Sequence, residues 1–295
     1  MAKFRIQPHV RLQEWVAEQK GYFADEGLDY EFEPTSFAGT DFTTSAIRTT
    51  DEAPAEARSG AFEDMQQGRS CDVSAACHWA VNLAATAHRG RMWGHAYSVS
   101  PSAIVVAPES AIQRPEDLAN VPVGVGYHSG SHYSAIQGLA PFVRRDDIQL
   151  NFAGRPNDRV RLMLNRSIPA ANVFGMHYYL LEQHGFRTIV DTTFMIGFLL
   201  SPAADADDVE KYFAALRRAQ RDIDLEPERY KHYWLREMPE DFRAIADVRR
   251  FGPGERIVFE PYTREMFEQT HRWMQTWDLE PEMPAQARYE EAVLA

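Results

Sequence analysis

Short apolar runs alternate with amphipathic runs over the first 200 residues, and this alternation constrains the fold more than any other feature of the chain. The apolar runs have the length of buried strands, and the runs between them place apolar residues at helical spacing. Alternating strands and helices are typical of α/β proteins with mostly parallel sheets. The predicted strands cover residues 3–7, 28–33, 71–75, 92–99, 103–107, 121–125, 148–152, 170–174, 188–190 and 194–200.

The chain has 295 residues, which is enough for two lobes of ordinary domain size. The run at 103–107 falls between two groups of strands, so we predict two lobes with a ligand cleft between them. Residues 34–54 are polar and predict a loop near the mouth of that cleft, and 56–67 predict a helix. The last third of the chain is mainly helical, with predicted helices at 205–222, 230–237, 239–248 and 263–276.

The net charge of the chain limits which binding partners it can have. The net charge is −12, with 43 acidic against 31 basic residues, which argues against nucleic acid but permits a small anionic ligand.

No apolar run has the length of a membrane-spanning helix, and no leader precedes the first predicted strand, so we expect a soluble, cytoplasmic protein. Cys71 and Cys77 are too few for a disulfide framework, and we expect both to be reduced.

The segment 121–142 reads VPVGVGYHSGSHYSAIQGLAPF and predicts a strand, a Gly/Ser turn and a helix. This geometry aims free backbone N–H groups at an anion. Either serine of the turn could cap the helix, and its glycine lets a ligand approach the backbone closely. The candidate ligand-binding residues of the turn are Tyr127, His128, Ser129, Gly130, Ser131 and His132.

Four histidines, His9, His78, His128 and His177, each follow a predicted strand, where open α/β sheets bind their ligands. His9, His78 and His177, with Cys77 as a softer addition, could hold a divalent transition metal. Alternatively, His9, His78 and His128 could act as general acids and bases near neutral pH. They could also donate hydrogen bonds to a carboxylate, sulfonate or phosphate, or be ordinary polar residues at helix starts.

Other polar and aromatic side chains are weaker candidates. Trp79 and Tyr127 could stack on an aromatic ligand, and Arg11 could pair with an anionic one. We expect Asn172 to be a turn residue and Arg159 to lie near the outer surface of its helix. We also expect the histidines of the amphipathic helices, His184, His232 and His271, at the surface.

Four segments carry a family resemblance: WVAEQKGYFADEGLDYEF at 15–32, GAFEDMQQGRSCDV at 60–73, AIVVAPESAIQRPEDLANVPVGV at 103–125, and the turn GYHSGSH. They resemble the type II periplasmic solute-binding fold, in the branch of nitrate, sulfonate and thiamine-precursor binding proteins that includes a pyrimidine synthase. The resemblance implies one lobe from 1–100 plus 201–295 and a second from 101–200, closing on a ligand by hinge motion. The synthase's cysteine-rich motif is missing, as is its lysine beside the histidine at 78.

Cytoplasmic relatives of this fold include enzymes. Our first hypothesis is therefore an intracellular enzyme that acts on a small anionic, perhaps aromatic, metabolite by histidine acid–base or metal-assisted lyase or decarboxylase chemistry. The alternative is a non-catalytic binding protein of an ABC-type importer for a sulfonate, a carboxylate or a thiamine precursor. A homodimer is compatible with both hypotheses.

Overall fold

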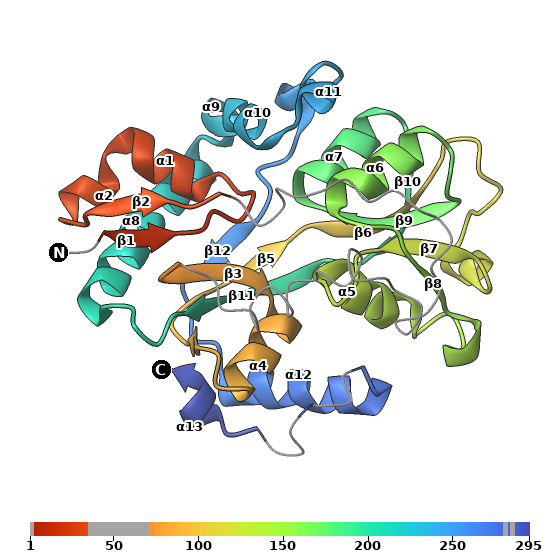
Figure 1. Ribbon diagram of the computed structural model, residues 1–295. Coiled ribbons are helices and arrows are strands. Elements are labelled where there is room, and N and C mark those ends of the chain that lie inside the picture. Colours follow the sequence, from red (N-terminus) through yellow and green to blue (C-terminus); the bar gives the residue numbers. More distant parts are fainter. Residues whose placement is uncertain (1–2, 35–70, 280–282, 284–286) are drawn as a thin grey trace.

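The computed structural model describes residues 3–34, 71–279, 283 and 287–295 of the chain. Two β-sheets lie next to each other, and helices cover them (Figure 1). The first sheet takes its strands from both ends of the sequence, and the second takes its strands from the middle. The predicted two-lobed α/β architecture is confirmed, whereas the exact division at 100 and 200 stays a prediction.

The first sheet has the order β12-β5-β11-β3-β1-β2, and β4 joins β11 to β13 beside this path. β1, β2 and β3 run parallel, and α1 and α2 connect the first two of them, as expected for neighbouring parallel strands. The strands are β1 (Phe4–Ile6), β2 (Tyr30–Phe32), β3 (Val73–Cys77), β4 (Arg91–Trp93), β5 (Tyr97–Ser100), β11 (Phe194–Leu200), β12 (Arg256–Val258) and β13 (Val293–Leu294).

The second sheet has the order β10-β6-β9-β7-β8. Its centre is parallel, because β7 pairs with β8 and β9 in the same direction. The strands are β6 (Ser102–Val106), β7 (Pro122–Val125), β8 (Gln149–Phe152), β9 (Ala170–Phe174) and β10 (Arg187–Asp191).

The chain passes from one sheet to the other twice, between β5 and β6 and between β10 and β11. These crossing strands pair antiparallel with their neighbours in both sheets. The prediction of mostly parallel sheets is therefore wrong, since each sheet is mixed. β11, the strand that brings the chain back to the first sheet, runs antiparallel to its neighbours β3, β4 and β5.

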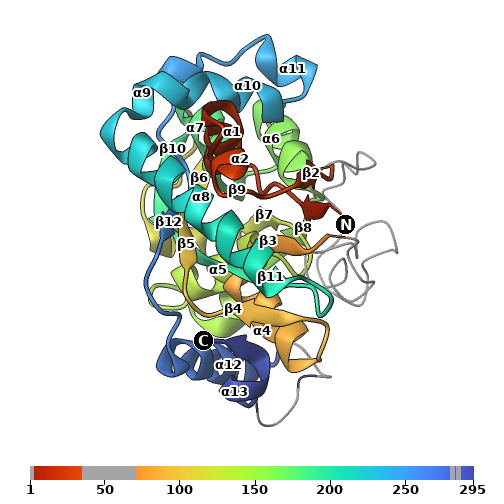
Figure 2. The same cartoon turned by 90° about the vertical axis from the view of Figure 1, so that its left-hand side faces the viewer.

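The helices follow the strands of both sheets. α8 is the longest, and it begins at Asp205, whose carboxylate accepts hydrogen bonds from the N–H groups of Asp207 and Asp208. It packs across α1 and α2 (Figure 2). The helices are α1 (Gln13–Lys20), α2 (Tyr22–Asp25), α4 (His78–Thr86), α5 (Gly130–Leu139), α6 (Pro156–Leu164), α7 (Gly175–Gln183), α8 (Ala206–Leu225), α9 (Pro227–Tyr230), α10 (Trp234–Glu237), α11 (Glu240–Arg243), α12 (Arg264–Trp277) and α13 (Tyr289–Ala292).

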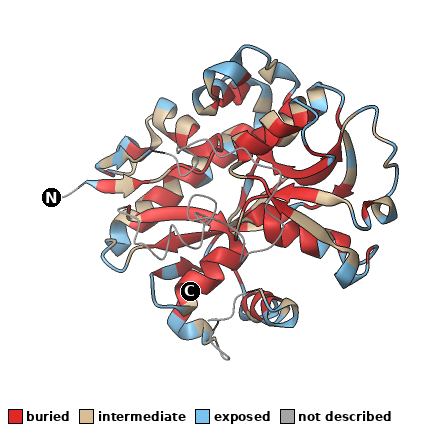
Figure 3. Ribbon diagram, turned by 45° about the vertical axis from the view of Figure 1, so that its right-hand side comes forward, coloured by how far each residue is buried: buried red, intermediate tan, exposed pale blue. Residues whose placement is uncertain are grey.

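The core follows the central strands, which are buried along their whole length (Figure 3). β3, β6 and β9 each bury five consecutive residues, as strands covered on both faces do. None of the helices among the described residues is both long enough and apolar enough to cross a membrane.

Some predicted elements differ from the structure. The single strand predicted at 92–99 is two strands, β4 and β5, because the chain turns at Gly94, where an added Cβ would lie 2.7 Å from the carbonyl oxygen of Leu294. β12, β13 and α13 were not predicted. The predicted loop at 34–54 lies outside the described residues except for its first residue. The predicted helix at 56–67 lies entirely outside them.

Residues 231–254 connect the two halves of the molecule. On one side, Trp15 of α1 donates from Nε1 to Oε1 of Glu237 at 2.6 Å. On the other, Arg161 of α6 donates from Nε to Asp241 at 2.9 Å, and Gln183 of α7 donates to the carbonyl of Ile245 at 3.0 Å. This part of the helical tail therefore contacts helices of both sheets.

Candidate functional site

The turn after β7 stands at the carboxyl edge of the second sheet. The Ser129 hydroxyl donates to the carbonyl of Gly126 at 2.9 Å, and the Gly126 N–H donates to the Ser131 hydroxyl at the same distance. Neither serine side chain caps α5, contrary to prediction; together they hold the turn in shape. The N–H groups of His132 and Tyr133 donate to the Ser129 carbonyl.

The first N–H groups of α5, those of Gly130 and Ser131, form no hydrogen bond with any part of the chain that the structure describes. Such groups at a helix start carry the positive end of the helix dipole and suit an anion. α6 and α7 begin at the same sheet edge, after β8 and β9. Three helix starts therefore converge there.

The end of β3 in the first sheet meets this turn. A Cβ added to Gly130 would lie 3.2 Å from Cβ of Cys77 and 2.5 Å from the ring of Phe194. The Trp79 ring lies 5.7 Å from that of Tyr133 and 5.9 Å from that of Phe194. The structure thus brings Cys77, Trp79 and the glycine-serine turn together, although they come from different sheets.

Asn172 of β9 ties the turn to the crossing strands. Its side-chain amide donates to the Ser131 carbonyl and to the Ser134 hydroxyl, both at 2.8 Å. Its side-chain oxygen accepts from the hydroxyls of Ser102 and Thr192. Asn172 is fully buried inside a strand, so the prediction of a turn residue is wrong.

His78 contacts α12 through Nδ1. This atom is 3.1 Å from the Thr270 hydroxyl and 3.3 Å from that of Tyr262. Burial lowers the pKa of His78 to about 3, so the ring is neutral at physiological pH. One helical turn further on, Asn82 accepts from Nδ1 of His271 at 3.2 Å; His271 is buried, not at the surface as predicted.

His128 and His132 lie in the turn with nearly parallel rings, 5.9 Å apart. The ring of Tyr127 lies 3.8 Å from that of His128. Nδ1 of His132 is buried and has no hydrogen-bond partner among the described residues. Burial, and then the charge of His128, lower the pKa of His132 to about 3.

His177 lies at the start of α7, where its Nε2 is 2.8 Å from the side-chain oxygen of Asn157 on α6. Burial, and then the charge of Arg159, lower the pKa of His177 to about 3. His177 therefore joins two of the three converging helix starts as a neutral ring.

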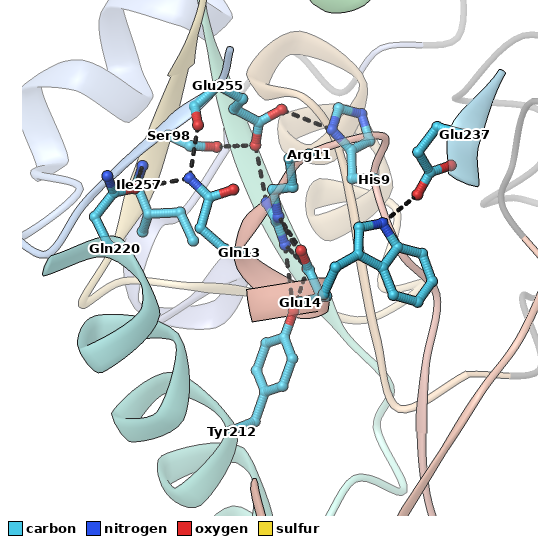
Figure 4. Close-up of polar contacts among 11 residues, drawn as sticks. His9, Arg11, Gln13, Glu14, Ser98, Tyr212, Gln220, Glu237, Glu255 and Ile257 are labelled. Carbon is cyan, nitrogen blue, oxygen red and sulfur yellow. Dashed lines mark hydrogen bonds and ion pairs between the residues drawn. The ribbon is translucent and has the colours of Figure 1, made fainter. Parts of the chain in front are cut away.

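His9 and Arg11 belong to a buried network after β1 (Figure 4). Nδ1 of His9 lies 2.8 Å from Oε2 of Glu255, and Nη1 of Arg11 donates to Oε1 of the same carboxylate at 2.8 Å. Arg11 also pairs with Glu14 and donates to the hydroxyl of Tyr212. Two carboxylates thus neutralise Arg11, so the predicted pairing of Arg11 with a ligand has no support in this geometry.

Glu255 is a site residue that the sequence did not reveal. It is buried, accepts a further hydrogen bond from Ser98 of β5, and stands directly before β12. The backbone carbonyl of Glu255 accepts from Gln13, which also contacts Gln220 of α8. The sequence offers only a glycine, Gly254, directly before it, and this residue type permits the φ of 78° that the structure has there.

The predicted metal ligands do not come together. His9 contacts Glu255, His78 faces α12 and His177 contacts Asn157. Within the described residues, no three His, Cys, Asp or Glu side chains are arranged to hold a metal ion. Cys77 offers no nucleophile, because burial raises the pKa of its thiol to about 12.

Two sheets between which the chain crosses twice, with helix starts at the carboxyl edge of the second sheet, define the type II solute-binding fold. Solved structures share it over the whole chain. The alkanesulfonate-binding protein SsuA from Xanthomonas axonopodis pv. citri, bound to MOPS, has a TM-score of 0.70 at 15% identity, covering 100% of this chain and 98% of that one. The periplasmic aliphatic sulphonate binding protein SsuA from Escherichia coli has a TM-score of 0.67 at 16% identity, covering 99% and 92%.

The desulfurization enzyme DszB also has this fold, with a TM-score of 0.59 at 11% identity, covering 99% of this chain and 96% of that one. Another structure of that enzyme is a complex of a mutant with biphenyl-2-sulfinic acid. No protein-family model and no curated protein sequence matches the chain. The structural similarity establishes the fold, and identities this low establish nothing further. Both binding proteins and an enzyme use this fold.

Proposed function

We propose that this chain is a solute-binding protein that takes up a small organic anion, such as a sulfonate, between its two sheets and releases it unchanged. The observation that carries the proposal is the start of α5, where the N–H groups of Gly130 and Ser131 have no hydrogen-bond partner among the described residues and Gly130 lies against Cys77 at the end of β3. The similarity to two sulfonate-binding proteins over nearly the whole chain supports the same ligand class.

The chemistry of three buried histidines and of Cys77 favours binding over catalysis. Burial lowers the pKa of His78, His132 and His177 to about 3 each, so these rings are neutral and only weakly basic near neutral pH. The Cys77 thiol is protonated. These groups can hold a ligand by shape and by hydrogen bonds, but they are poorly suited to general acid–base or thiolate chemistry.

An enzyme acting on a small anion is the second candidate, and the pair of His9 and Glu255 favours it. A carboxylate at Nδ1 orients an imidazole and stabilises its protonated form, as in many general bases. The fold also carries a desulfurization enzyme. The cytoplasmic location and a homodimer stay predictions under either candidate.

Calorimetric titration of the purified chain in a phosphate-free, sulfonate-free buffer tests the proposal. The ligands are MOPS, taurine and butanesulfonate, with butanol as the uncharged control. We expect saturable binding of at least one sulfonate, and its complete recovery, unchanged by mass spectrometry, after prolonged incubation. Conversion of the ligand would favour the enzyme, and failure of every sulfonate to bind would contradict the proposal.

A further inference from the structure

Arg159 is a buried cation next to the turn after β7. The sequence predicts it at the outer surface of its helix, yet its side chain is 1% exposed and is among the largest fully buried ones. Its Nε donates to the carbonyl of Asn172 at 3.1 Å, and its Nη1 donates to the carbonyl of Gly154 at 2.7 Å. These neutral partners satisfy hydrogen bonds but leave the positive charge uncompensated.

The other buried cations of the described chain differ from Arg159 in this respect. Arg11 pairs with Glu14 and Glu255, and Lys231 pairs with Glu228 at 2.6 Å. Within the residues that the structure describes, no carboxylate forms an ion pair with Arg159. Its neighbour Asp158 is 3.6 Å from Nη1 of Arg161 and accepts from the Arg155 N–H. A buried charge without a counter-ion is costly, so a bound anion would relieve that cost.

The guanidinium lies directly against the turn. A Cβ added to Gly126 would lie 3.0 Å from Nη1 of Arg159 and 2.9 Å from the Ser129 hydroxyl. The same turn presents the open N–H groups of Gly130 and Ser131. Burial lowers the pKa of Arg159 to about 10, with the charge of Asp158 acting in the opposite direction, so the group stays charged at neutral pH. In this low-dielectric setting the charge acts on an anion held by the turn without needing to touch it.

We infer that Arg159 is the counter-charge of a singly charged anion held at the start of α5, and that the site therefore selects monoanions such as sulfonates and carboxylates over dianions such as phosphonates. The inference rests on the proposed function and specifies its ligand class. One uncompensated buried cation balances one negative charge. A second negative charge would find the other buried cations of the described chain already paired.

The experiment compares three ligands with the same butyl chain: butanesulfonate, butylphosphonate at a pH where it carries two charges, and the neutral butyl methyl sulfone. Affinities are measured for wild type, Arg159→Gln, Arg159→Lys and the exposed control Arg166→Gln. For wild type and Arg166→Gln we expect tight sulfonate binding and weaker phosphonate and sulfone binding. We expect Arg159→Gln to lose roughly tenfold or more of its sulfonate affinity while sulfone affinity changes little, and Arg159→Lys to lie between.

The ratio of sulfonate to sulfone affinity separates a counter-charge from a structural role, because a loosened turn would weaken both ligands alike. Equal ratios in wild type and Arg159→Gln, or tighter phosphonate than sulfonate binding by wild type, would overturn the inference while leaving anion binding intact. Absence of binding by wild type would instead overturn the proposed function. If Arg159→Gln does not fold, Arg159→Lys and the wild-type ligand ratios decide.

Discussion

Oε2 of Glu255 lies 2.8 Å from Nδ1 of His9, although 246 residues separate the two in sequence. The same carboxylate binds Arg11 and Ser98, so it joins the segment after β1 to the crossing strand β5. All four residues are buried. The segment just before β12 is thereby fixed against the segment that follows β1.

Replacing Glu255 with glutamine should strongly destabilise the protein. The change keeps the volume but removes the charge that balances His9 and Arg11, and breaking a buried pair costs about 3–5 kcal/mol. The free energy of unfolding, measured in urea at pH 7, is the readout. Glu260→Gln, at an exposed position in the same part of the chain, is the control and should change little. A loss below about 1 kcal/mol for Glu255→Gln, the range of exposed pairs, would contradict the network's role.

The difference between wild type and Glu255→Gln should also depend on pH. Burial alone would raise the pKa of Glu255, but the charges of His9 and Arg11, and then hydrogen bonds from His9 and Ser98, lower it from 4.5 to about 2. A lowered acid pKa gives stability that is complete above about pH 4.5 and is lost as the pH falls toward 2. The two unfolding curves should therefore converge in that window, and a constant difference would contradict this assignment.

His132→Phe should make the protein less sensitive to mild acid. The pKa of His132 is about 3 in the folded chain against an ordinary 6.5, so protonation of the unfolded chain costs stability as the pH falls below 6.5. Between pH 7.5 and pH 5, the variant should lose on the order of 2 kcal/mol less unfolding free energy than wild type. The exposed His184→Gln should behave like wild type. Identical acid sensitivity in all three proteins would show that the pKa of His132 in the folded protein is not lowered.

Gly130→Ala should destabilise the protein, although alanine is the better helix former. The new Cβ would lie 2.5 Å from the Phe194 ring, and overpacking of this kind costs about 1–3 kcal/mol. Phe194→Leu in the same chain should recover part of the loss, giving a positive coupling in a double-mutant cycle. Additive effects of the two changes would mean that Gly130 and Phe194 are not packed together.

The fluorescence of Trp15 should change with pH near neutrality, because the carboxyl group of Glu237 beside it ionises there. Burial raises the pKa of Glu237 from 4.5 to about 7, despite the hydrogen bond from Trp15. Ionisation of a carboxylate 2.6 Å from the indole nitrogen should change the emission of Trp15. In Glu237→Gln the transition should vanish, and its persistence there would assign it to another group. The raised acid pKa also means that this pair loses stability as the pH rises from 4.5 to 7.

The sequence predicted most strand positions and the edge at which the turn lies. Strand and helix periodicity are local properties, so the strand, turn and helix around Gly130 could be assigned from the chain alone. The meeting of Cys77 with this turn also followed from the general position of ligands in open α/β sheets. Antiparallel crossing strands could not be seen, because strand direction depends on the connection between sheets.

Side-chain partners from distant segments could not be predicted. His78 stands where a ligand-facing histidine was expected, but α12 supplies Thr270, and the segment before it supplies Tyr262, to its Nδ1. Arg159 was assigned to solvent because a charged residue on a helix is usually exposed, whereas the carbonyls of Gly154 and Asn172 hold it inside. Both outcomes depend on tertiary contacts that leave no periodic signal.

The most direct test of the account is a crystal structure of the chain with butanesulfonate. We predict the ligand between the two sheets, with sulfonate oxygens about 3 Å from the backbone nitrogens of Gly130 and Ser131. A sulfonate group bound elsewhere, or one that leaves both N–H groups without contact, would contradict the account.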